Sequence, residues 1–199
     1  MRNTTEEYQN QIHLTYSSLV EHLLEKYGAA KEDYFTNESC ISKNRKVSRT
    51  KEGLVCHHID EDKAIRLSND QYAKKNPFSY QKAERLVYCN LLEHLLLHIK
   101  ITEKPRDINA NTNEFLGIGG AIQFICRELN DFYSGQTPTQ QWKERLMQAV
   151  IDNYDDYIIM LQYLWEVVQK DPRYKGIITK EDLAKDWNGN IVTEIYNRL

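Results

Sequence analysis

The 199-residue chain lacks the features that mark several common classes of protein. It has no run of eighteen or more apolar residues, which argues against a transmembrane helix. The N-terminal stretch "MRNTTEEYQNQ" is polar and acidic, unlike a secretory signal. No internal repeat and no low-complexity segment is visible. The composition, with 41% hydrophobic and 28% charged residues, is that of an ordinary soluble globular protein.

Cysteine is scarce and widely spaced. No two cysteines form a CxxC pair, so we expect neither a disulfide framework nor a cysteine-rich zinc site. Reduced thiols in a cytoplasmic protein are the better expectation. The four positions are Cys40, Cys56, Cys89 and Cys126.

Charge is distributed unevenly along the chain. Residues 41–105 carry 13 basic against 8 acidic residues, a balance of +5. Residues 1–40, with 3 against 7, and residues 106–199, with 10 against 14, each have a balance of −4. A basic middle between acidic flanks points to a polyanion contact there, although a solvated face would look the same.

Hydrophobic periodicity predicts a mainly α protein with one small β element. Apolar residues recur at helical spacing in several segments, and two short β-type runs, 54–56 and 85–89, interrupt them. Asn90 and Glu93 form a capping-box pair at the start of the helix after the second run. Gly28 is a candidate C-terminal cap. The expected helices are 4–27, 90–101, 112–134, 139–169, a short one capped by Thr179, and a last one in 191–199.

Four of the six histidines fall into two groups beside these short strands. His57 and His58 lie at the end of the first run, in "CHHID". His94 and His98 lie four residues apart on the following helix, so both imidazoles share one face and can approach one ion. If the strands pair as a hairpin and the helix packs across them, the two groups converge.

Adjacent histidines on a strand point to opposite sides. One can therefore bind a metal while the other reaches a water molecule. This division suits phosphodiester hydrolysis, since a metal neutralises charge on the phosphate and a neutral histidine takes a proton from the attacking water.

Segment 53–101 resembles the ββα-metal finger of HNH, or His-Me finger, endonucleases. "VCHHI" resembles that family's first element, and "RLVYCNLLEHLLLHIKI" its second strand and ligand-bearing helix. The resemblance implies that His57, His94 and His98 are metal ligands and that His58 is the general base. This sequence departs from the family pattern in two ways. Arg85 stands where the family has its middle Asn, and the connection 59–85 is long for such a finger. Two asparagines of that connection are candidates to take over the loop-holding role, Asn69 and Asn76.

Other interpretations of these motifs stay open. A zinc peptidase motif would need Glu after the first histidine, whereas Glu93 precedes His94. Asp60 could add a carboxylate ligand or lie in a solvated turn. "GIGGA" at 117–121 is not a P-loop and is better explained by close helix packing.

Basic residues before and within the connection suit contacts with a phosphate backbone. A mobile solvated loop would have the same composition. The candidate nucleic-acid contacts are Lys43, Arg45, Lys46, Arg49, Lys51, Lys74, Lys75 and Arg85.

These features together predict a mainly α protein with a small ββα-metal finger (α+β). We expect an N-terminal helix and basic loop (1–52), the nuclease-like module (53–101) and a C-terminal helical region (102–199). The expected function is metal-dependent hydrolysis of DNA, with RNA as the alternative, in a phage, mobile-element or phage-defence system.

The cofactor would be one divalent ion, Zn²⁺, Mn²⁺, Ni²⁺ or Mg²⁺, with three imidazoles favouring a transition metal. The C-terminal helices could mediate homodimerisation or bind a protein partner, and no membrane contact is expected. A non-catalytic helical binding or regulatory protein with a metal-stabilised finger is the alternative.

Overall fold

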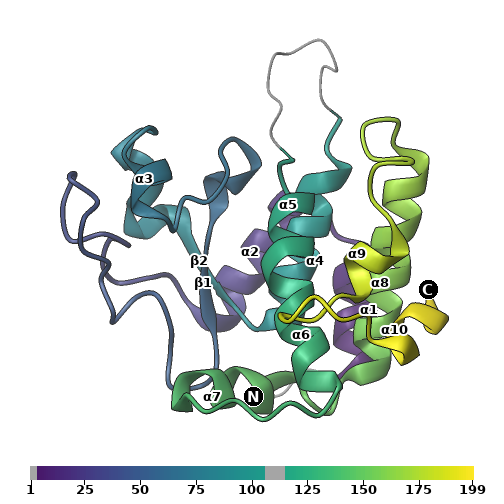
Figure 1. Ribbon diagram of the computed structural model, residues 1–199. Coiled ribbons are helices and arrows are strands. Elements are labelled where there is room, and N and C mark those ends of the chain that lie inside the picture. The colour runs from purple at the N-terminus through teal and green to yellow at the C-terminus, as the bar shows by residue number, and fades with distance from the viewer. Residues whose placement is uncertain (1–3, 106–114) are drawn as a thin grey trace.

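The computed structural model describes residues 4–105 and 115–199, which form a mainly helical protein with one two-stranded antiparallel sheet (Figure 1). The mainly α prediction with a small β element is confirmed. The elements are α1 (Thr5–Ile12), α2 (Tyr16–Tyr27), β1 (Val55–His58), η1 (Ile59–Asp62), α3 (Asp70–Ala73), η2 (Phe78–Gln81), η3 (Ala83–Arg85), β2 (Leu86–Cys89), α4 (Leu91–Glu103), α5 (Ile118–Gly120), η4 (Ala121–Ile125), α6 (Cys126–Tyr133), α7 (Gln141–Val150), α8 (Tyr154–Lys170), α9 (Lys180–Ala184) and α10 (Thr193–Arg198).

The two strands pair as a hairpin with a folded connection. His57 stands opposite Val87 and His58 opposite Leu86. Between the strands, three short 3₁₀ turns and α3 fold the 27-residue connection back beside the sheet. Because side chains alternate between the faces of a strand, the two histidines leave β1 on opposite sides.

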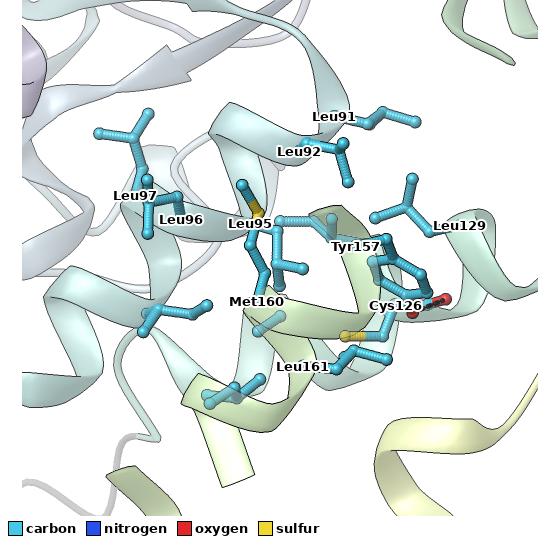
Figure 2. Close-up of a cluster of buried hydrophobic side chains, with 14 of the residues drawn as sticks. Leu91, Leu92, Leu95, Leu96, Leu97, Cys126, Leu129, Tyr157, Met160 and Leu161 are labelled. Carbon is cyan, nitrogen blue, oxygen red and sulfur yellow. Dashed lines mark hydrogen bonds between the residues drawn. The ribbon is translucent and has the colours of Figure 1, made fainter. Parts of the chain in front are cut away.

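Helix α4 is the central element of the fold. The Asn90 side chain accepts from the backbone N–H groups of Leu92 and Glu93, and the Glu93 carboxylate accepts from the Asn90 N–H, so the predicted capping box is confirmed. The helix is apolar around most of its circumference, which is typical of a buried helix. Figure 2 shows Leu95 of this helix beside Met160 of α8, and both belong to the same buried cluster as Leu129 of α6.

Two long predicted helices are each broken in the structure. The segment 4–27 forms α1 and α2, because the Thr15 hydroxyl accepts from the Ser18 N–H and starts a new helix. The segment 139–169 forms α7 and α8, with a break at 151–153. Apolar periodicity continues across both breaks, so it did not reveal them. The predicted caps at Gly28 and Thr179 are confirmed.

The predicted helix 112–134 begins later than expected. Residues 112–114 lie outside the described part of the chain, and α5 starts at Ile118. The helix then passes through one π-helical segment, η4, before α6. Single π-helical turns occur frequently at functional sites.

The main hydrophobic core joins all three segments expected from the sequence. It contains Leu19 of α2, Leu95 of α4 and Leu161 of α8, each with no exposed surface. The expected segment boundaries remain a prediction. All four cysteines are buried and unpaired. Within 4–105 and 115–199, no helix is both long and apolar enough to cross a bilayer.

Candidate metal centre

Four side chains from three elements converge beneath the hairpin. One ligand atom from each of His57, Glu61, His94 and His98 lies within 4.8 Å of the others. We call this set the histidine cluster. It contains the three predicted ligands together with a carboxylate, and it could hold a metal ion.

Strand β1 and helix α4 supply the three imidazoles. His57 points from β1 toward α4, where His94 and His98 occupy one face a single turn apart. The ring centroids of His57 lie 5.2 Å from His94 and 5.3 Å from His98, and the two helix rings are 4.9 Å apart. The expected convergence of the two histidine groups is therefore present.

Glu61 is the ligand candidate that sequence reasoning missed. The 3₁₀ turn η1 follows β1 directly and folds the chain back, placing Glu61 over His57. Its Oε2 atom lies 3.7 Å from His57 Nδ1 and 3.2 Å from His98 Nε2. Asp60, the residue considered instead, faces away and pairs with Arg85 and Lys63. No spacing along the chain distinguishes Glu61 from Asp60, because His57 lies on a strand and Glu61 in a 3₁₀ turn.

A tyrosine fixes the tautomer of His57. The Tyr16 hydroxyl donates to the Ile59 carbonyl at 2.8 Å, so it must accept from His57 Nε2–H at 3.0 Å. The proton on Nε2 leaves Nδ1 as a lone pair. His57 Nδ1 is buried and has no hydrogen-bond partner, and it faces the other members of the cluster.

The "GIGGA" segment holds His98. The Gly117 carbonyl accepts from His98 Nδ1–H at 2.9 Å, so Nε2 is the nitrogen that faces Glu61 Oε2, at 3.2 Å, and the one that would ligate a metal. Gly117 has a φ of +79°, a conformation that favours glycine. A Cβ atom on Gly120 would lie 2.2 Å from His98 Cε1. The expected close packing is present, and its partner is a residue of the histidine cluster.

Burial favours the neutral form of His57 and His94. Desolvation lowers the pKa of His57 to about 3 and also lowers the pKa of His94, where the neighbouring imidazoles add to the effect. Desolvation would raise the pKa of Glu61, but the hydrogen bond from His98 and the surrounding imidazoles lower it below its ordinary range. Neutral imidazoles beside a carboxylate are the protonation states that ligate a metal.

The four side chains could hold a single metal ion. Ligand atoms about 2.0–2.2 Å from one ion lie at most about 4.4 Å apart, so the observed spread of up to 4.8 Å requires a small closure. A buried imidazole nitrogen without a partner is costly in the absence of a ligand. Hydrogen bonds to the outer nitrogens of His57 and His98 are the orienting contacts usual for metal-ligating histidines.

His58 lies on the other face of β1, adjacent to the histidine cluster. Its Nε2–H donates to Gln81 Oε1 at 2.8 Å, and the Gln81 amide donates to the Leu67 carbonyl at 3.2 Å. The lone pair is then on Nδ1, which lies 3.9 Å from Glu61 Oε1. His58 is 1% exposed, and burial lowers its pKa.

Gln81 also ties down the long connection, because it bridges His58 and the Leu67 backbone. The two asparagines considered for that task have local roles. Asn69 caps α3 by accepting from the Gln71 N–H, and Asn76 donates to the Tyr72 carbonyl. Sequence reasoning missed Gln81 because nothing local marks a glutamine in a 3₁₀ turn.

A pocket of about 550 Å³ opens beside the histidine cluster. Glu61, His94 and His98 contribute to its wall. The other lining residues are Lys43, Ile65, Arg66, Ser68, Asn69, Phe115, Gly117, Gly119, Gly120, Gln123, Phe124 and Ile125. This is the size of pockets that hold small organic ligands, roughly 300–1,000 Å³.

The predicted nucleic-acid contacts have different surroundings. Lys43 lines the pocket. Arg85 forms a bidentate ion pair with buried Asp60 at 2.6 and 2.7 Å. The Arg49 guanidinium carbon lies 3.4 Å from the Trp142 ring centroid.

The remaining predicted contacts lie on the surface. Two of them form ion pairs, Lys46 with Glu32 at 3.9 Å and Lys74 with Asp70 at 3.1 Å. Three exposed residues complete the set, Arg45, Lys51 and Lys75. A role of any of the eight residues in nucleic-acid binding stays a prediction.

Comparisons with protein-family models, curated protein sequences and solved structures returned no match. The functional argument therefore depends on the motif and on the geometry of the histidine cluster.

Proposed function

We propose that this protein is a metal-dependent endonuclease of the His-Me finger type that hydrolyses phosphodiester bonds of DNA in the cytoplasm. The observation that carries the proposal is the position of His58. Its Nδ1 lone pair faces Glu61 of the histidine cluster, while Gln81 holds its other nitrogen. A candidate base thus lies beside a candidate metal centre, on the strand that also supplies His57.

His58 is the proposed general base. Because Nε2–H is held by Gln81, Nδ1 is the nitrogen that would accept a proton from water. Its lowered pKa keeps the ring neutral near pH 7, the state in which it can accept. Gln81 is a positioning residue, since it acts through His58.

Three imidazoles and one carboxylate are the proposed ligands of one divalent ion. This donor set favours Zn²⁺, Ni²⁺ or Mn²⁺ over Mg²⁺, which prefers oxygen ligands. When bound, the ion would neutralise charge on the phosphate and on the leaving oxygen. Lys43 at the rim of the pocket, with the exposed lysines and arginines of 45–51, would hold the phosphate backbone by charge.

A cleavage assay with purified protein tests the proposal. Plasmid and single-stranded DNA are incubated with Zn²⁺, Ni²⁺, Mn²⁺, Mg²⁺ or EDTA. We expect metal-dependent cutting that falls about 10²–10⁴-fold in His58→Ala, the usual contribution of a general base. His13→Ala, at an exposed histidine outside the centre, is the matched control and should cut normally. Undiminished cutting by His58→Ala would exclude the assigned base.

A second candidate function is a metal-stabilised binding or regulatory protein. One observation favours it: four protein ligands are enough to fill a tetrahedral structural zinc site. This candidate predicts that one metal ion binds per chain and that no nucleic acid is cut under any of the conditions above.

A further inference from the structure

The pocket beside the histidine cluster has a second wall that the proposed chemistry does not use. Phe115 and Phe124 line it, and they are 44% and 45% exposed, unusual for phenylalanine in a protein whose other aromatic side chains are mostly buried or half-buried. Exposed aromatic rings that line a pocket are typical of a binding surface.

Phe124 is held in a special backbone segment. It lies in the π-helical η4, between the glycines that contact His98 and the start of α6. One short segment therefore carries both Phe124 and Gly120, which packs against His98. The aromatic wall of the pocket and the support of His98 belong to the same stretch of backbone.

A cation lies next to this ring. Arg66 lines the pocket with a φ of +54°, a left-handed conformation rare for arginine. Its guanidinium carbon is 5.4 Å from the Tyr72 ring centroid and 5.6 Å from that of Phe124. Within 4–105 and 115–199, neither Arg66 nor Lys43 forms an ion pair with a carboxylate. Strained backbone is found preferentially at functional sites.

The aromatic rings and the cations that line the pocket are complementary to the base and the phosphate of one nucleotide. Aromatic rings and guanidinium groups stack on unpaired bases, and cations bind the phosphate. A pocket of about 550 Å³ accepts one base with its sugar and phosphate, not a base pair with both backbones. Two members of the histidine cluster in the pocket wall are almost buried: the side chain of Glu61 is 13% exposed and that of His98 is 7% exposed. The surface of a duplex would therefore not reach them.

We infer that the pocket binds a single unpaired nucleotide, with its base against Phe124 and Arg66 and its phosphate toward Lys43 and the histidine cluster. The substrate class is then single-stranded nucleic acid, or an unpaired position in a duplex. This inference rests on the proposed function and narrows its substrate.

Fluorescence anisotropy tests the inference without requiring cleavage. Labelled single-stranded DNA, single-stranded RNA and a hairpin duplex of the same sequence are titrated with Zn²⁺-loaded protein. We expect single strands to bind about tenfold tighter than the duplex, and Phe124→Ala to remove most of that difference. Ile177→Ala, which removes an apolar side chain that is 59% exposed outside the pocket, should bind as the wild type does.

The contribution of the Arg66 cation to binding is tested in the same anisotropy assay. Arg66→Ala should weaken single-strand binding about tenfold, whereas Lys170→Ala, a 77% exposed side chain on α8, should not. Tighter binding of either DNA or RNA assigns the sugar of the preferred nucleotide. Equal affinity for duplex and single strand, or Phe124→Ala and Arg66→Ala indistinguishable from their controls, would overturn the inference.

Cleavage of the same oligonucleotides separates this inference from the proposed function. Selective binding without cleavage under any metal would reject the nuclease and retain the pocket. Cleavage of a strand carrying abasic sites as efficiently as the normal strand would retain the nuclease and reject the base-binding pocket.

Discussion

Helix α4 contributes to two buried groups of ionisable side chains on its different faces. The adjacent residues Glu93 and His94 each belong to one of them. Glu93 faces α1 and α2, whereas His94 faces β1. Glu93 Oε1 accepts hydrogen bonds from Gln11, Lys26 and Tyr27 at 3.3, 3.0 and 3.2 Å. Its Oε2 accepts from the Asn90 N–H at 2.9 Å. We call this set the Glu93 network.

The histidine cluster has the opposite character. Protein groups occupy the outer nitrogens of His57 and His98, while their inner nitrogens face Glu61 and one another. A carboxylate whose lone pairs are all taken by protein donors stabilises the fold. Imidazole nitrogens that converge on one another and on a carboxylate are arranged for something the chain itself does not supply, such as a cation.

The largest expected difference between the two groups is in their response to metal. Saturating Zn²⁺ should stabilise the wild type by about 4 kcal/mol when the free ion exceeds its Kd about 1,000-fold. His94→Ala removes one ligand and should abolish this stabilisation. Thermal denaturation with Zn²⁺ and with EDTA measures it. An equal shift in His94→Ala would place the metal elsewhere.

The second-largest effect expected is a loss of stability when the Glu93 network is disrupted, and it should not depend on metal. Glu93→Gln removes the more buried of the two carboxylates that pair with Lys26, the other being Glu7, and it also weakens the acceptor for the Asn90 N–H. We expect the free energy of unfolding to fall by about 2–3 kcal/mol, as measured by urea denaturation in EDTA. Isothermal titration should give an unchanged Zn²⁺ affinity. A lost affinity would show that the two faces of α4 are not independent.

A smaller effect should come from the glycines that support His98. In Gly120→Ala the new Cβ meets the His98 ring, so we expect metal affinity to weaken about 10–100-fold. Gly119→Ala is the matched control, because its Cβ would lie 3.5 Å from Phe115 Cβ, an ordinary contact. Competition with a chromogenic chelator gives both affinities. Similar affinities in the two variants would mean that His98 is not positioned by Gly120.

Sequence patterns predicted the elements around the histidine cluster because their signals are local. The Asn90–Glu93 capping box, the apolar run of α4 and the i, i+4 spacing of its histidines each depend on neighbours within one helical turn. The alternation of His57 and His58 follows from strand geometry alone. These local rules also predicted the mainly helical fold.

Long-range contacts decided what the patterns could not. Glu61 and Asp60 are adjacent acidic residues, and only the 3₁₀ turn with the Arg85 ion pair determines which one faces His57. Gln81 reaches His58 across 23 residues and Tyr16 reaches His57 across 41. The breaks at Thr15 and at 151–153 lie inside continuous apolar patterns, where caps and packing override periodicity.

The sequence by itself therefore determined the helical and strand segments, apart from the helix breaks, and the shared face of His94 and His98, since each is specified within a few residues of chain. The tertiary structure decided the carboxylate of the cluster, the tautomers of its histidines and the pocket beside it. Those features depend on which backbone carbonyl, hydroxyl or ring lies next to a side chain after folding, and no spacing along the chain encodes that position.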